Sequence, residues 1–111
     1  GHYVTSGYIN GQVVTFLLDT GATTVAIPEW LAQQIGLEKG RQVRVGTANG
    51  DAIAYTTSIN ELRVGELRLR DVRASILSGM NGDQVLLGMS ALKQVSFSQQ
   101  GDELTIKFQQ F

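Results

Sequence analysis

The chain has 111 residues, of which 42% are hydrophobic and 17% are charged, and its formal net charge is -1. This length suits one domain with a core of its own, so we expect a single domain over residues 1–111. The near-neutral net charge differs from the strongly positive charge that is typical of nucleic-acid-binding domains. No apolar run approaches the ~18 residues that a membrane-spanning helix needs. Cysteine is absent, which excludes disulfides, a thiol nucleophile and thiolate metal sites.

The distribution of turn residues and β-branched residues predicts a mostly β fold. Thirteen glycines and a single proline separate many short runs rich in Val, Ile, Thr and Tyr. Residues 2–9 and 12–19 predict a hairpin on an Asn10-Gly11 turn, where both central residues must tolerate positive φ. Residues 28–35 then predict a helix of about two turns, with Pro28 at its first position and Gly36 closing its end.

The second half of the chain predicts further strands. Residues 41–59 indicate a hairpin that projects from the body, and residues 59–77 supply two or three more strands. Residues 84–87 predict a buried strand that ends before Gly88. A short helix is expected after this glycine. Residues 95–108 predict a final hairpin, in which Leu104, Ile106 and Phe108 would share one face. The four arginines between residues 63 and 73 alternate with apolar residues, which favours a solvated strand face over a basic patch.

The stretch FLLDTGATTVAIP, residues 16–28, brings an aspartate to the end of an apolar run. Asp19-Thr20-Gly21 by itself is a weak motif, because a strand that ends in an Asx turn has the same sequence. The preceding residues are too apolar for a surface turn, so we expect the Asp19 carboxylate at the edge of the core. Gly21 allows another segment to come close. Val85–Gly88 repeats the pattern of an apolar strand ending in glycine, and the two strands can run side by side.

This pair of motifs resembles the retropepsin-like (clan AA) aspartic proteases, particularly the bacterial single-domain type. The matching stretches are Leu17-Leu18-Asp19-Thr20-Gly21-Ala22, the hairpin from Thr47 to Ile53 with its Ala-Asn-Gly tip, and Leu86-Leu87-Gly88 before Met-Ser. They occur in the order and spacing of that family and cover nearly the whole chain. The resemblance implies a closed β-barrel-like half-pepsin fold with a flap hairpin and one or two short helices.

The resemblance also implies an aspartic endopeptidase that acts as a C2 homodimer on a peptide or protein substrate. One Asp-Thr-Gly is present, so Asp19 of each subunit would meet on the axis, share one proton and activate a water. No cofactor or metal is expected. The implied site comprises Asp19 as the catalytic residue, Thr20, Gly21 and Ala22 as loop support, Thr47, Ala48, Asn49, Gly50, Asp51 and Ile53 in the flap, and Leu86, Leu87 and Gly88 as the second motif.

Several positions depart from the relatives or leave alternatives open. Ala22 replaces the hydroxyl residue of pepsin-like enzymes, which predicts a less acidic working range. Thr23 and Met89 stand where viral enzymes pair an Asp with an Arg, so the viral mode of dimer stabilisation is in doubt. Residues 103–111 either interleave with a second subunit or close the chain's own core. Trp30 is expected in core or interface packing.

Two other functions compete with the endopeptidase hypothesis. The first is a non-catalytic retropepsin-like module for dimerisation or peptide binding. The second is a different hydrolase with a lone Asp19, although no His, Cys or Lys candidate accompanies it. The single histidine, His2, follows Gly1 in what resembles the remnant of an expression tag. Bacterial relatives are often anchored by an N-terminal segment and face the periplasm, which gives an expectation of location only.

Overall fold

The computed structural model describes residues 2–19, 24–47, 50–88, 91, 95–100 and 103–108, and the side chains of residues 3–19, 24–46, 50–88 and 91. In chain order the elements are β1 (His2–Ile9), β2 (Gln12–Asp19), β3 (Val25–Pro28), α1 (Glu29–Ile35), β4 (Gln42–Thr47), β5 (Gly50–Val64), β6 (Leu67–Leu77), β7 (Gln84–Leu87), β8 (Val95–Gln100) and β9 (Glu103–Phe108). The predicted mostly β fold is confirmed. No helix in these ranges is long and apolar enough to cross a membrane.

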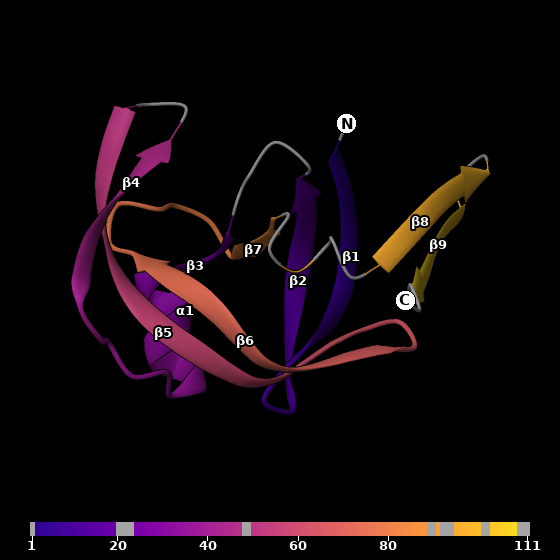
Figure 1. The fold of residues 1–111 in the computed structure, drawn as a ribbon, viewed down its shortest axis with the longest axis horizontal. Helices are drawn as coiled ribbons and strands as arrows, with labels where there is room; N and C mark the ends of the chain where they lie inside the picture. The colour runs from indigo at the N-terminus through magenta and orange to yellow at the C-terminus, as the bar shows by residue number, and fades with distance from the viewer. Residues whose placement is uncertain are drawn as a thin grey trace.

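Six strands close into a barrel (Figure 1). The strand order is β1-β2-β7-β3-β6-β5, β1 pairs with β5 to complete the ring, and β4 extends the sheet beyond β5. Each of these six strands therefore pairs with a neighbour on both sides, and the ring has no edge strand. The predicted final hairpin forms as β8 and β9, which pair with each other in a separate two-stranded sheet. The face predicted for Leu104, Ile106 and Phe108 falls outside the described side chains.

The first hairpin has the turn that its sequence predicts. Asn10 and Gly11 adopt φ of 50° and 83°, the left-handed values that a two-residue hairpin turn requires. Asn10 also ties this turn to the neighbouring strand β5. Its backbone N–H donates to the carbonyl oxygen of Glu61 at 2.9 Å, and its Oδ1 accepts the Glu61 N–H at 3.0 Å. The turn therefore fixes the end of β1 against the strand that closes the barrel.

Helix α1 ends as predicted but begins one residue later. Gly36 adopts a φ of 89°, its N–H donates to the carbonyl of Gln33 at 3.2 Å, and Leu37 N–H donates to the carbonyl of Ala32 at 2.9 Å. These bonds form a Schellman cap. Pro28 is not the first helical residue but the last residue of β3, a strand that the sequence analysis did not predict. All four residues of β3 are buried between β6 and β7, and this packing determines their extended conformation.

Trp30 is not a core residue. Its side chain is 48% exposed, and its indole Nε1–H donates to the carbonyl oxygen of Gly82 at 2.8 Å. Of the two alternatives expected for Trp30, packing in the core is therefore wrong, because the helix turns this side chain outward, toward the loop that precedes β7, whereas packing at an interface stays a prediction. The residue instead joins α1 to that loop.

The long β5–β6 hairpin changes faces near its middle. The core-facing residues of β6 are Leu67 and Leu69 before Asp71, and Ala74 and Ile76 after it. Asp71 adopts a φ of 54°, which breaks the alternation of the strand. The two or three strands expected over residues 59–77 are the end of β5 and the whole of β6. The arginines at positions 68, 70 and 73 are exposed, as the predicted solvated face requires.

The barrel interior holds the main hydrophobic core. Its fully buried members come from β1, β2, β3, β5, β6 and β7, and helix α1 adds its apolar face at one end. The largest are Phe16, Ile9, Leu18, Ile27, Ile59, Leu62, Ile76 and Leu87. Leu37 and Tyr55 pack against this core from positions that are partly exposed. Every strand of the ring therefore directs one face into the core, and its other face forms the outer surface of the barrel.

Gly7 lies at the seam where β1 pairs with β5 to close the barrel, and we expect its substitution to destabilise the protein. A Cβ at Gly7 would lie 2.2 Å from the carbonyl oxygen of Arg63 and 2.7 Å from the Phe16 ring. Because neither the strand backbone nor the buried ring can move freely, we expect Gly7→Ala to lower the free energy of unfolding by roughly 1–3 kcal/mol. Urea denaturation measures this loss. Gly79→Ala is the control, since nothing lies within 4 Å of its Cβ position; equal stability of the two variants would contradict the tight seam.

Candidate active site

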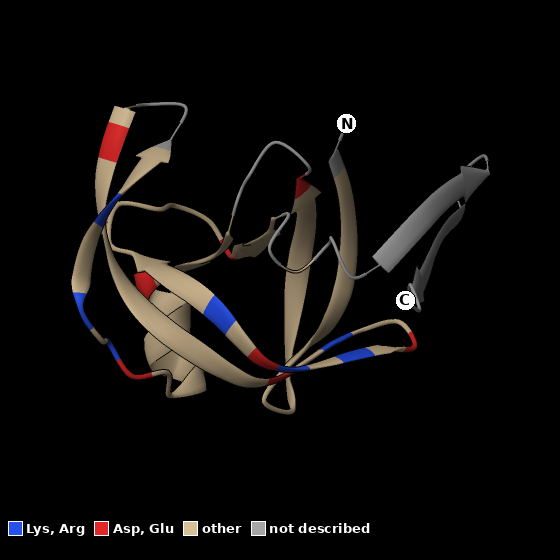
Figure 2. Ribbon diagram, in the orientation of Figure 1, with Lys and Arg blue, Asp and Glu red and all other residues tan. Residues whose placement is uncertain are grey.

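Asp19 is the last residue of β2 and lies beside the second motif of the sequence. β2 and β7 are parallel neighbours, with Leu17 opposite Leu86 and Leu18 opposite Leu87. Continuing this register by one residue places Asp19 beside Gly88, at the carboxyl ends of both strands. The predicted side-by-side arrangement of the two strands is thus confirmed. The acidic position at the tip of β2 can be seen in Figure 2.

The alternation of β2 explains why an apolar strand ends in an acid. Phe16 and Leu18 point into the barrel and are 0% and 1% exposed. Leu17 and Asp19 stand on the opposite face and are half-buried. On β7 the division is the same, since Leu87 belongs to the core and Leu86 faces outward with Leu17. The carboxylate is therefore placed at the outer surface of the barrel by a strand whose other face anchors the core.

A second apolar cluster lies on the outer face. Its buried members are Ala26, Ala54 and Leu77, and the half-buried residues packed against them are Val43, Val45, Met80 and Leu86. Leu86 connects this cluster to the aspartate, because it lies opposite Leu17 on one side and opposite Ala26 on the other. The cluster thus forms an apolar surface from the Asp19 strand to the arms of the β4–β5 hairpin. No pattern in the sequence indicates this cluster, since its members come from five strands and a loop.

The β4–β5 hairpin has the two arms predicted for a flap (Figure 1). Its pairs run from Gln42 opposite Tyr55 to Thr47 opposite Gly50. Gly50 adopts a φ of 104°, which suits a glycine beside the tip. Ile53, on the second arm, is 45% exposed although it is apolar. Ile53 lies opposite Arg44, between the positions of Val43 and Val45, so it stands on the face of the hairpin that points away from the second cluster and is available for contact with a ligand on that side.

The other predicted site residues are placed as follows. Asp51 is exposed on β5, and Leu86 and Leu87 lie on opposite faces of β7. Thr20, Gly21, Ala22, Ala48 and Asn49 lie outside the described residues, as do Thr23 and Met89. Ala91, in the region of the expected second helix, is buried and donates its N–H to the carbonyl of Gly88 at 3.1 Å. Within the described part of the chain, no group of three His, Asp or Glu side chains can hold a metal ion.

Several known proteins are similar to this chain. An uncharacterized protein in the cobV 5' region of Sinorhizobium sp is 34% identical over 111 residues, and the Uncharacterized protein RP867 of Rickettsia prowazekii (strain Madrid E) is 32% identical over 97 residues. These alignments cover 96% and 85% of this chain but 48% and 41% of the relatives. The chain therefore spans about half the length of the curated relatives that it matches.

Two solved structures share the fold. The crystal structure of a retropepsin-like aspartic protease from Rickettsia conorii matches with a TM-score of 0.72 and 28% identity, covering 96% of this chain and 89% of that one. EIAV protease, in a complex with the inhibitor HBY-793, matches with a TM-score of 0.67 and 20% identity, covering 84% and 86%. The model of the family "gag-polyprotein putative aspartyl protease" matches residues 5–94. With this match over most of its length, the chain belongs to the retropepsin-like aspartic proteases.

Proposed function

We propose that this chain is an aspartic endopeptidase that acts as a homodimer, with Asp19 as the catalytic residue. The proposal rests on the position of Asp19, which ends a core strand beside Gly88 and stands on the outer face next to an apolar surface. The stability of the fold does not require an exposed apolar surface beside this carboxylate, so the surface is available for binding a substrate. Membership of the aspartic protease family gives this carboxylate its proposed chemistry.

The reaction needs two carboxylates, and a C2 dimer supplies the second as Asp19 of the partner subunit. Two adjacent carboxylates repel each other, so the pair holds one proton. The ionised member takes a proton from a water while that water bonds to the peptide carbonyl carbon, and the protonated member donates to the carbonyl oxygen. Collapse of the intermediate breaks the C–N bond and returns a proton to the leaving amine. Thr20 would join the active-site loops of the two subunits through its hydroxyl. The small residues Gly21 and Ala22 would let these two loops come close to each other.

The substrate would bind as an extended peptide between the paired Asp19 turns and the β4–β5 hairpins. Residues Thr47 to Ile53 would then form a flap that closes over the peptide and excludes water. An extended peptide can add main-chain hydrogen bonds like an extra strand, while side-chain pockets select its residues. The cluster that contains Ala26, Val45 and Leu86 would supply an apolar surface for such a side chain, because Val45 and Leu86 are only partly covered. We therefore expect apolar side chains next to the cleaved bond.

Replacement of Asp19 tests the catalytic assignment. We expect the wild-type chain to cleave members of a mixed peptide library between about pH 3 and 7, and Asp19→Asn to cleave none, because an amide cannot take a proton from water. Mass spectrometry of the digests measures cleavage and reports the preferred side chains. Asp83→Asn, an exposed residue outside the site, is the matched control. Cleavage by Asp19→Asn would refute the assignment, and cleavage by neither chain as a dimer would favour a binding module.

Mixing of subunits tests whether the site is shared. With substrate in excess, a tenfold excess of Asp19→Asn subunits should lower the activity of a fixed amount of wild type about tenfold, since nearly all wild-type subunits then sit in mixed dimers. Initial rates after subunit exchange measure this effect. The same excess of Asp83→Asn should raise the total rate. An unchanged rate with excess Asp19→Asn would show that each chain works alone.

Two adjacent leucines test the division of β7 into a core face and a substrate face. Leu87 is 1% exposed in the main core, so Leu87→Ala should lower the free energy of unfolding by about 2–5 kcal/mol. Leu86 is half-buried in the outer cluster, so Leu86→Ala should cost only about 1 kcal/mol. Its kcat/KM should instead fall about tenfold through loss of pocket contacts. Urea denaturation and peptide cleavage measure these effects, and equal losses of stability would contradict the division.

A further inference from the structure

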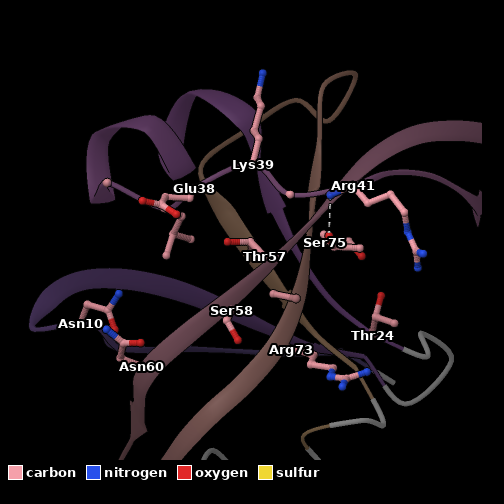
Figure 3. A pocket seen from close by; sticks show the side chains of 15 residues that line it. Asn10, Thr24, Glu38, Lys39, Arg41, Thr57, Ser58, Asn60, Arg73 and Ser75 are labelled. Atoms are coloured by element: carbon pink, nitrogen blue, oxygen red, sulfur yellow. Dashed lines mark hydrogen bonds between the residues drawn. The ribbon is translucent and has the colours of Figure 1, made fainter.

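A polar groove of about 1040 Å³ lies between the loop that follows α1 and the strands β5 and β6 (Figure 3). Its lining includes Arg41, Thr56, Arg73, Ser75 and Thr24. Asp19 does not line it. The groove is nevertheless part of the same outer face, as the strand registers show.

The registers place these residues directly next to the outer apolar cluster. Ala54 of the cluster lies opposite Leu77, and two residues further along the strands Thr56 lies opposite Ser75. Arg41 continues β4 beside Thr56, whose N–H donates to the Arg41 carbonyl at 2.9 Å. Thr56 and Ser75 therefore lie on the same face of the sheet as the apolar cluster and directly adjoin it.

Neighbouring positions on four adjacent strands connect the groove with Asp19. Arg73 precedes Ala74, the register partner of Val25, so Thr24 lies beside Arg73 on the next strand. Ala26 lies opposite Leu86 in an antiparallel pair, so the step from Leu86 to Gly88 on β7 matches the step from Ala26 to Thr24 on β3. Asp19, Gly88, Thr24 and Arg73 thus follow one another across the sheet. Three strand spacings separate the first from the last, or about 14 Å.

The charges of the groove suit an anion. Arg41 and Arg73 are exposed, and within the described part of the chain neither forms an ion pair. Figure 3 shows both guanidinium groups extending to the same side, with Thr24 between them. Lys39 is engaged elsewhere, since it pairs with Glu29. The hydrogen bond to that carboxylate raises the pKa of Lys39. Glu38, an acidic residue of the lining, lies on the opposite side of the groove in this view.

The hydroxyl groups of the groove add donors. Ser75 is only 7% exposed, yet among the described residues no hydrogen bond to its hydroxyl is present. A buried hydroxyl without a partner is unfavourable, and a ligand can supply one. Thr56 Oγ1 accepts the Arg41 N–H at 2.9 Å, which leaves the Thr56 hydroxyl proton for donation. Gly40 makes this approach possible, because a Cβ there would lie 2.5 Å from Thr56 Oγ1.

We propose that this groove is a remote part of the substrate-binding surface that takes an acidic side chain of the peptide, held by Arg41 and Arg73 with the hydroxyls of Thr56 and Ser75. An extended peptide rises about 3.3 Å per residue, so the row from Asp19 to Arg73 spans about four residues. The acidic residue therefore belongs about four positions from the cleaved bond. In a C2 dimer the groove occurs twice, so the preference applies on both sides of that bond. This inference rests on the proposed endopeptidase function.

Paired peptides test the groove. Each pair has an apolar centre cleaved by the wild type and carries either Glu or Gln four residues away on each side. We expect kcat/KM to be about tenfold higher for the Glu peptide, through a lower KM, and to lose this advantage at high salt. In the double variant Arg41→Gln/Arg73→Gln the ratio of kcat/KM between the Glu peptide and the Gln peptide should fall to about one. Arg70→Gln, on an exposed part of β6 outside the groove, is the matched control and should keep the preference.

A binding measurement separates failure of the groove from failure of the proposed function. Fluorescein-labelled Glu and Gln peptides of the same design are titrated with Asp19→Asn, alone and combined with the double arginine change, and anisotropy gives Kd. We expect about tenfold tighter binding of the Glu peptide, lost with the arginines. Cleavage without a Glu preference would overturn the groove and leave the endopeptidase intact. Absence of cleavage with a retained, arginine-dependent Glu preference in binding would support the groove and refute the catalytic proposal, and absence of both would overturn both.

Discussion

The parallel pairing of β2 with β7 is the constraint on which the rest of the structure depends. It joins two strands that are far apart in the sequence and fixes Leu18 opposite Leu87 in the core. Because side chains alternate along a strand, a slip of one residue would exchange the two faces of β2 and turn Asp19 inward. Such a slip is opposed by Phe16 and Leu18, which would both lose their buried positions. The same apolar residues that form the core thus hold the carboxylate outside it.

The closed barrel gives every strand two distinct environments. The inner face is filled with large aliphatic side chains and Phe16, whereas the outer face near β3 and β5 carries Ala26 and Ala54. Small residues at these two positions leave the outer cluster shallow, so that Leu86 and the hairpin residues remain partly uncovered. A tightly packed interior thus supports an apolar surface that is only partly covered, to which an apolar side chain can bind.

Features set by local chemistry could be predicted from the sequence, and features set by register could not. Asn10-Gly11 and Gly36 determine their turns through positive φ, and the apolar runs before Asp19 and Gly88 indicate two buried strands. The four residues of β3 are extended because they are packed between β6 and β7, which no local preference of VAIP reveals. The outer cluster and the groove combine residues from several strands, and they become visible only when the pairings are known.

The outer face changes its chemistry with distance from the aspartate. Next to Asp19 it is apolar, at Leu86 and Ala26, and further across the sheet it becomes hydroxyl-rich and basic at Ser75 and Arg73. An extended peptide that follows this face meets the two environments at different positions along its length, so each can select a different kind of side chain. Each exposed arginine contributes only a weak ionic contact, but it does so without burying a charge beside Asp19. In the proposed endopeptidase, apolar contacts near Asp19 and ionic contacts remote from it can therefore contribute to specificity without altering the charge of the proposed catalytic pair.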